Sequence, residues 1–338
     1  MPVHQIHHSM RPLILPFIAL LILFLGSCQS KAQKKDDSNK MQLWYTSPAN
    51  EWLEALPIGN GRLGAMIFGG IKEDQIQLNE ESLWAGMPED PYPENVGKHY
   101  ATFQQLNLEG NYEEALNYGM EHLAVSPTSI RSYEPLGELH ISFDHQKSPE
   151  NYRRTLDMET GVITSTYTIN GKRYLREAFS SAKYNVIFYH FESLDGEPVS
   201  STIRFDREKD IVQSIGEGKT LYVDGQVFDD PDGYDDNVDG SGKTGLHMKF
   251  ASQITATLDD GSISGNENTL NIENSTGYTV IVSAATDYNL AKLNFDRNID
   301  AKEKALESLK GALETAYNTA KETHIAAQNC FFNMAGIF

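Results

Sequence analysis

The sequence predicts a mainly β protein: a large antiparallel β-sandwich (super-sandwich) with a short helical insertion and a C-terminal linker helix. Short apolar or alternating segments recur between residues 43 and 287, separated by Gly, Asn and Asp, a pattern typical of sandwiches. Helical spacing of apolar residues appears in two places, residues 94–125 and 300–323. The 338 residues suffice for one large all-β domain or two ordinary ones.

The first strands are expected soon after residue 43. Residues 57–64 are rich in Gly and Asn, which tolerate positive φ, and we interpret them as a turn-rich stretch. Residues 65–68 follow as a buried strand, and residues 74–79 alternate polar and apolar, which predicts a half-buried strand.

The clearest local signal is a hairpin. Two alternating segments, residues 162–169 and 172–177, are joined by Asn170 and Gly171. Asn-Gly favours the type I′ turn, whose twist matches that of the flanking strands. Residues 186–191 predict a further strand.

Two helical regions interrupt this pattern. Residues 94–125 predict two short helices broken at Gly110 and Asn111, an insertion that we expect to pack on the sandwich. Residues 300–323 predict one amphipathic helix rich in Lys and Glu. We place the domain boundary at this change from β to α, giving a sandwich over residues 43–295 and a helical linker over 296–338.

The N-terminus predicts export. The apolar run at residues 13–25, at about 1.5 Å per residue, is too short for a bilayer core of about 30 Å. It ends in LGSC, which resembles a bacterial lipobox with Cys28 as the lipidated residue. We therefore expect a signal peptide over residues 1–27, a polar tether over 28–42 and lipid anchorage to the bacterial cell envelope. The alternative is an ordinary secretory signal with an incidental Cys.

Composition narrows the possible functions. A hydrophobic content of 40% and a charged content of 22% fit a folded globular protein. A formal charge of −19 argues against a nucleic-acid partner, because phosphate backbones repel such a surface. The sequence lacks a Walker loop, a dinucleotide fingerprint, a nucleophile elbow and a helical pair of zinc-binding histidines. We expect no cofactor.

One segment, residues 78–86, is dense in groups that bind sugars. Sugar rings offer a CH face to aromatic platforms and a hydroxyl rim to amides and carboxylates. We name Trp84 as the candidate platform and Asn79 and Glu80 as candidate hydroxyl partners. The alternative makes Trp84 a core residue and Glu80 or Glu81 an exposed salt-bridge partner. Glu80 and Glu81 would point to opposite faces of a strand, so they make a poor acid–base pair, and no catalytic residue is assigned.

An acidic loop invites comparison with calcium sites. Asp235, Asn237, Asp239 and Gly240 match the first half of an EF-hand loop. The twelfth position is Leu246, where that loop requires a bidentate Glu. We interpret the loop as a solvated connection between strands and predict no metal.

The chain resembles glycoside hydrolase family 95. The resemblance rests on EWLEALPIGNGRLGAM at 51–66, QIQLNEESLW at 75–84, YEPLGEL at 133–139, YRRTLD at 152–157, REAFSS at 176–181 and SAATDY at 283–288. These segments occur in the family's order across residues 43–324. Residues 324–326 still resemble the family's junction between linker and barrel, whereas residues 328–334 depart from it.

The resemblance implies an N-terminal β-sandwich, a helical linker, an (α/α)₆ barrel and a C-terminal β domain. It also implies hydrolysis of α-1,2-linked L-fucose with inversion, with the acid and the base in the barrel. No catalytic residue can therefore be carried over, and we expect a truncated chain, inactive alone, whose family partners are fucosylated glycans. The alternatives are a stand-alone carbohydrate-binding lipoprotein and an enzyme whose barrel is a separate polypeptide. Without a barrel, the face that the sandwich and the 300–323 helix would bury against it should be exposed, which predicts poor solubility or self-association.

Overall fold

The computed structural model describes residues 41–86, 92, 95–124, 132–229 and 245–334. The predicted signal peptide 1–27, Cys28, the tether up to residue 40 and the Asp235–Asp239 loop lie outside these residues. Within them, no helix is both long and apolar enough to cross a membrane.

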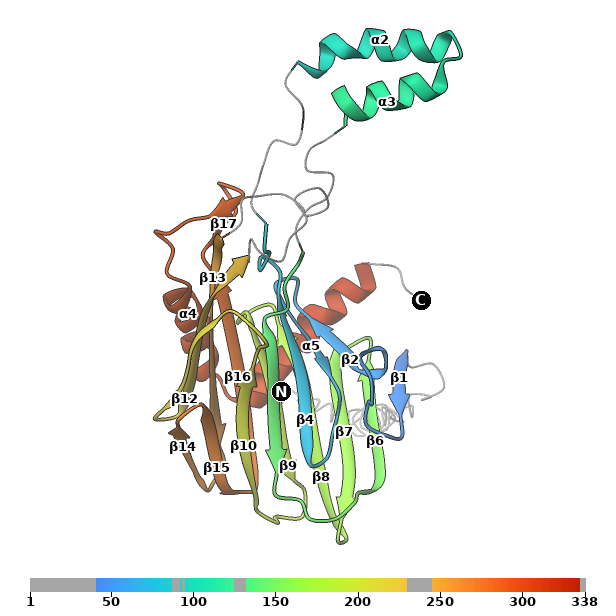
Figure 1. The fold of residues 1–338 in the computed structure, drawn as a ribbon. Coiled ribbons are helices and arrows are strands. Elements are labelled where there is room, and N and C mark those ends of the chain that lie inside the picture. The colour runs from blue at the N-terminus through green and yellow to red at the C-terminus, as the bar shows by residue number, and fades with distance from the viewer. Residues whose placement is uncertain (1–40, 87–91, 93–94, 125–131, 230–244, 335–338) are drawn as a thin grey trace, which may run out of the picture. The chain divides into compact units, whose positions relative to one another are not determined.

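Two antiparallel sheets face each other and form the predicted sandwich (Figure 1). The strands of the nine-stranded sheet, in spatial order, are β1 (Gln42–Tyr45), β6 (Glu150–Asp157), β7 (Val162–Ile169), β8 (Lys172–Ser181), β9 (Val186–Ser193), β16 (Gly277–Thr286), β13 (Gly245–Leu258), β12 (Thr220–Asp229) and β11 (Ile211–Glu217). The strands of the seven-stranded sheet are β14 (Ser262–Asn266), β15 (Thr269–Ser275), β10 (Val199–Asp206), β5 (Gly137–Phe143), β4 (Glu73–Glu80), β3 (Leu63–Ile67) and β2 (Leu56–Gly59). The short elements are η2 (Trp52–Glu54) and a β17 (Tyr288–Asn289)–β18 (Asn294–Phe295) hairpin.

The core lies between the two sheets and follows the two-residue period of the strands. On β4, Ile76 and Leu78 are buried whereas Gln77 and Asn79 are half-buried, which confirms the predicted alternation. Burying each such aliphatic side chain stabilises the fold by roughly 1.5–3 kcal/mol. Asp74 and Glu80 share the buried face of the same strand, so the sequence pattern alone did not identify every inward position.

The Asn170–Gly171 hairpin is confirmed. It joins β7 to β8, and both turn residues have positive φ, 53° and 76°, as a type I′ turn requires. The stretch predicted to be rich in turns, residues 57–64, contains one turn, at residues 60–62, where Gly61 has a φ of 90°. The strands β2 and β3 occupy the rest of it. In the turn, the Asn60 side-chain oxygen accepts hydrogen bonds from the amides of Arg62 and Leu63, at 2.8 Å each.

The two short helices of the insertion are also confirmed. They are α2 (Val96–Leu108) and α3 (Tyr112–His122), and Gly110, with a φ of 82°, lies in the break. The helices pack on each other, with the rings of His99 and His122 stacked 4.4 Å apart. Their packing on the sandwich stays a prediction.

The C-terminal region forms two helices rather than the single helix predicted. They are α4 (Ala301–Leu313), capped by the Asp300 carboxylate, and α5 (Tyr317–Met334). In α4 the buried side chains are Ala301, Ala305, Leu309 and Ala312.

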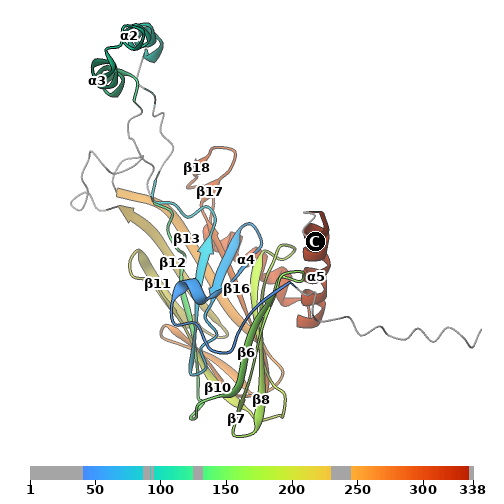
Figure 2. The same ribbon diagram turned by 90° about the vertical axis from the view of Figure 1, so that its right-hand side faces the viewer.

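Both helices cover the outer face of the nine-stranded sheet (Figure 2), α4 on β13 and β16 and α5 on β8. The expectation of an exposed apolar face is therefore wrong for α4, and for the sandwich it stays a prediction. The physical reason is visible in β16, where every residue from Gly277 to Thr286 is buried, so this strand needs cover on both faces.

Candidate functional site

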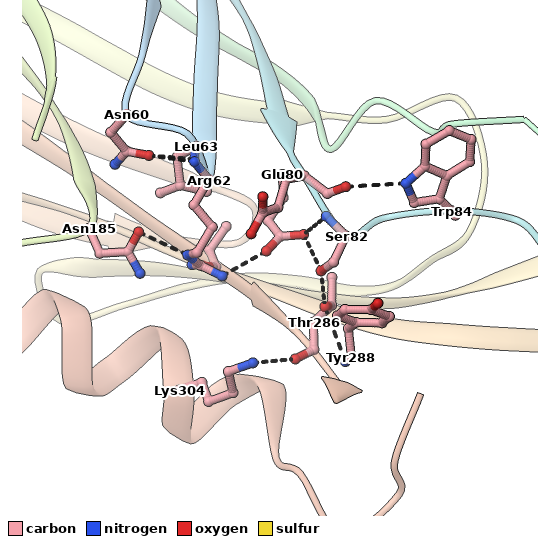
Figure 3. Close-up of polar contacts among 12 residues, drawn as sticks. Asn60, Arg62, Leu63, Glu80, Ser82, Trp84, Asn185, Thr286, Tyr288 and Lys304 are labelled. Carbon is pink, nitrogen blue, oxygen red and sulfur yellow. Dashed lines mark hydrogen bonds and ion pairs between the residues drawn. The ribbon is translucent and has the colours of Figure 1, made fainter. Parts of the chain in front are cut away.

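The predicted sugar-binding segment lies at the end of β4. The chain leaves the strand after Glu80 and turns through Glu81 and Ser82 towards Trp84 (Figure 3). Trp84 pairs with Tyr133 in an isolated bridge. Residues far apart in the sequence meet here, because β3, β9 and β16 bring their ends to the same side.

Glu80 lies inside the protein and is only 1% exposed. Its Oε1 accepts a hydrogen bond from Arg62 Nη1 at 2.7 Å, and its Oε2 accepts from the Ser82 amide and hydroxyl at 2.8 and 2.7 Å. Burial raises the pKa of Glu80, although the Ser82 hydrogen bonds and the Arg62 charge oppose that rise. Both carboxylate oxygens are therefore bonded to neighbouring protein groups.

Arg62 extends this contact to the facing sheet. Its Nε donates to Asn185 Oδ1 at 2.8 Å, and its Nη2 donates to the carbonyl of Ala284. The Ser82 hydroxyl lies 2.5 Å from the Thr286 hydroxyl. We call Arg62, Glu80, Ser82, Asn185 and Thr286 the Arg62–Glu80 cluster. It ties the start of residues 81–84, which we call the Trp84 loop, to both sheets.

Lys304 of α4 approaches the same cluster. Its Nζ donates to the Thr286 carbonyl at 3.2 Å. Burial and the Arg62 charge lower the pKa of Lys304. The linker helix is therefore joined by a polar contact to the strand end that holds Ser82.

Trp84 has the opposite environment to Glu80. It is 37% exposed, and its indole N–H donates to the Glu81 carbonyl at 3.2 Å. The Tyr133 ring packs edge-on at 5.3 Å, and the Tyr133 hydroxyl donates to the Glu80 carbonyl at 2.9 Å. The two rings form an exposed aromatic pair in a fixed orientation, the Trp84–Tyr133 pair, as a sugar platform requires.

The structure therefore separates the three predicted residues. Trp84 is at the surface, Glu80 is a buried ion-pair partner, and Asn79 is half-buried on the opposite face of β4. Sequence reasoning missed Arg62 and Tyr133, although both lie in segments that carried the family resemblance.

Comparison with known proteins agrees with this architecture. Residues 43–291 match the family model described as glycosyl hydrolase family 65, N-terminal domain. The chain belongs to this family. The resemblance to family 95 named a different family number, but the related proteins below are fucosidases, as it implied.

Two relatives of this family 65 N-terminal domain are fucosidases. This chain is 33% identical over 177 residues to Alpha-L-fucosidase 2 from Arabidopsis thaliana, and the match covers 52% of this chain and 21% of that protein. It is 25% identical over 316 residues to Probable alpha-fucosidase A from Aspergillus niger, covering 86% of this chain and 37% of that protein. The chain thus spans between a fifth and two fifths of these relatives.

A solved structure, "Putative kojibiose phosphorylase from human microbiome", is similar with a TM-score of 0.45 and 12% identity. The match covers 86% of this chain and 38% of that one.

The other carboxylates near the site of this family 65 domain differ in environment. Glu134 lies 3.5 Å from both Arg207 and Lys209, whereas Glu81 is exposed. Over the described residues, no group of three or more His, Cys, Asp or Glu side chains is placed to hold a metal ion.

Proposed function

We propose that this chain is the sandwich portion of an α-L-fucosidase-type glycoside hydrolase that acts on α-1,2-fucosylated glycans. In this proposal the sandwich contacts the glycan and the hydrolysis requires a further domain or polypeptide. The observation that carries it is the exposed Trp84–Tyr133 pair, held in place by the buried Arg62–Glu80 cluster.

The Trp84–Tyr133 pair suits a sugar ring. A methyl-bearing ring such as fucose presents an apolar face, and an indole ring fixed on one side by a tyrosine offers a matching surface. The Tyr133 hydroxyl is already bonded to the Glu80 carbonyl, so the Tyr133 ring contributes orientation. Asn79 stays a predicted hydroxyl partner.

Glu80 acts in this proposal as a positioning residue. Both carboxylate oxygens are bonded to Arg62 and Ser82, and Ser82 begins the turn that leads to Trp84. The ion pair therefore fixes the loop rather than touching the sugar. The same bonds make Glu80 a poor general acid or base, since a catalytic carboxyl group must reach the scissile bond.

The second candidate is a stand-alone carbohydrate-binding module. The packing of α4 and α5 favours it. Both helices bury apolar side chains on the outer face of the sandwich, so the sandwich and the helical linker form one compact unit. Translation of the downstream DNA in all frames separates the candidates. A frame that encodes a barrel supports the hydrolase portion, and a downstream region without one supports the binding module.

Export and anchorage are also proposals. They are supported by the apolar run at 13–25 and the LGSC sequence that ends at Cys28. Metabolic labelling with a palmitate analogue tests them. The chain should carry the label and the Cys28→Ser variant should not; equal labelling of both would refute lipidation at this residue.

Binding is tested by titrating the full chain with 2′-fucosyllactose in a calorimeter. Trp84→Ala should weaken binding about tenfold or more, because it removes the aromatic platform. Trp52→Ala is the matched control, since Trp52 is also exposed but lies in η2. Absence of binding, or equal weakening by both substitutions, would refute the site.

A further inference from the structure

The helices leave one part of the outer sheet face open. They cover β8, β16 and β13, whereas the outward side chains of β11 and β12 include the exposed Ile215 and Tyr222. Two adjoining hollows lie there, about 230 and 520 Å³ in volume, between β11–β13 and the start of α4. Asp224 and Lys302 line both hollows, and these volumes bracket the lower limit of small-molecule sites, roughly 300 Å³.

Strand register places the lining residues in rows. Ile215, Tyr222 and Gln253 are directly opposite one another across β11, β12 and β13. Gln213 and Asp224 form the next row along the same face, because alternate residues of a strand share a face. The surface thus presents a phenol ring beside an aliphatic side chain, with carboxamides on two sides.

Lys302, at the start of α4, forms one wall of both hollows. Its Nζ lies 3.0 Å from Asp224 Oδ1. Each charge is therefore balanced by the other, and a ligand need not bring a charge to satisfy them. Glu217, which lines the smaller hollow, disfavours an anion.

Gln253 shows an unused hydrogen-bonding group. It is 4% exposed, lines the smaller hollow, and donates from Nε2 to the Lys302 carbonyl at 3.0 Å. Because that carbonyl can only accept, the amide nitrogen must face it. Gln253 Oε1 is buried and has no hydrogen-bond partner among the residues that the structure describes. Such a buried acceptor is costly unless a donor reaches it.

We propose that this surface is a second binding site, specific for the ring of a neutral sugar. The Tyr222 ring stacks on the apolar face of the sugar, and the carboxamides of Gln213 and Gln253 bond its hydroxyls, a hydroxyl supplying the donor that Gln253 Oε1 lacks. This combination of one aromatic surface and planar polar groups suits an uncharged ring that has both CH and OH edges. The site lies on the nine-stranded sheet, whereas Trp84 follows β4 of the other sheet, so it stands independently of the proposed fucosidase role.

The test uses the full chain carrying Trp84→Ala, so that the first proposed site cannot contribute. The probes are 2′-fucosyllactose, lactose, cellotetraose and xylotetraose, each titrated in a calorimeter. At least one should bind, and adding Tyr222→Ala should weaken that binding about tenfold, whereas Tyr222→Phe, which keeps the ring, should retain most of it. Tyr112→Ala, an exposed tyrosine of α3, is the control and should change nothing.

Gln213→Ala provides a second variant that spares the fold, since this side chain is exposed. It should weaken binding severalfold, with an unchanged thermal midpoint. Absence of binding by all four sugars in the Trp84→Ala chain would overturn the proposal. So would binding that neither Tyr222→Ala nor Gln213→Ala reduces.

Discussion

Arg176 of β8 lies 3.3 Å from Asp74 of β4, and this ion pair joins the two sheets inside the core. Asp74 Oδ1 also accepts the amide of Gly69 at 2.7 Å, and Asp74 Oδ2 accepts the Tyr189 hydroxyl at 2.8 Å. Arg176 donates to the Gly70 carbonyl at 2.6 Å. Both charges are removed from water and depend on each other.

Removing one partner of this pair should be severe. Asp74→Ala leaves the Arg176 guanidinium buried without its counter-charge, and we expect a loss of about 3–5 kcal/mol in the free energy of unfolding by urea. The double variant Asp74→Leu, Arg176→Met should lose less than the single one. Asp195→Ala, which removes the exposed partner of Arg173, is the control and should leave the midpoint nearly unchanged. A similar loss in Asp74→Ala and Asp195→Ala would contradict this account.

Stability should fall in mild acid because of His145. Burial, aided by the nearby Arg176 charge, lowers the pKa of His145 to about 4. The unfolded chain therefore binds a proton near pH 6.5 that the folded chain does not accept until about pH 4, and the free energy of unfolding decreases as the pH falls through this window. We expect roughly 1–2 kcal/mol from this group. Urea unfolding at pH 7.5 and 4.5 measures it, and His145→Phe should reduce the difference. An unchanged difference in that variant would refute the role of His145.

Alanine substitutions of the adjacent residues Glu80 and Glu81 should differ in their effects on stability and binding. Glu80→Ala frees Ser82 and leaves Arg62 without its partner, so we expect a loss of about 2–4 kcal/mol in stability and weaker glycan binding through the loosened Trp84 loop. Glu81→Ala is the matched control, because Glu81 is the exposed neighbour. Chemical denaturation and calorimetry provide the two readouts. If Glu81→Ala costs as much binding as Glu80→Ala, the positioning role is wrong.

The linker helix should be part of the folded unit. Leu309 of α4 is only 3% exposed and packs on the sheet. Leu309→Ala should lower the free energy of unfolding by about 2–4 kcal/mol, because the substitution leaves a cavity. Leu313→Ala, at the exposed end of the same helix, should cost little. Equal effects in thermal unfolding would show that α4 does not pack as described. The predicted self-association assumed an exposed apolar helix face. The sheet covers the apolar side chains of α4, so α4 gives no reason to expect it.

Sequence patterns predicted the sandwich well where local chemistry decides. Asn170 and Gly171 specify a turn by their own φ preference, and Ile76 and Leu78 mark the inner face of β4 by alternation. The patterns missed what depends on distant partners. The burial of Glu80 depends on its ion pair with Arg62. The packing of α4 on β16 was not predicted either, because the buried positions of β16 include the polar residues Thr279, Ser283 and Thr286.

In the proposed function, the sandwich recognises a fucosylated glycan without hydrolysing it. The most direct measurement follows free fucose and bound 2′-fucosyllactose in the same samples of purified full chain, with Trp84→Ala in parallel. We expect saturable binding that Trp84→Ala weakens about tenfold, with no fucose released by either protein. Release of fucose by the unmodified chain, or the absence of binding to it, would contradict the account.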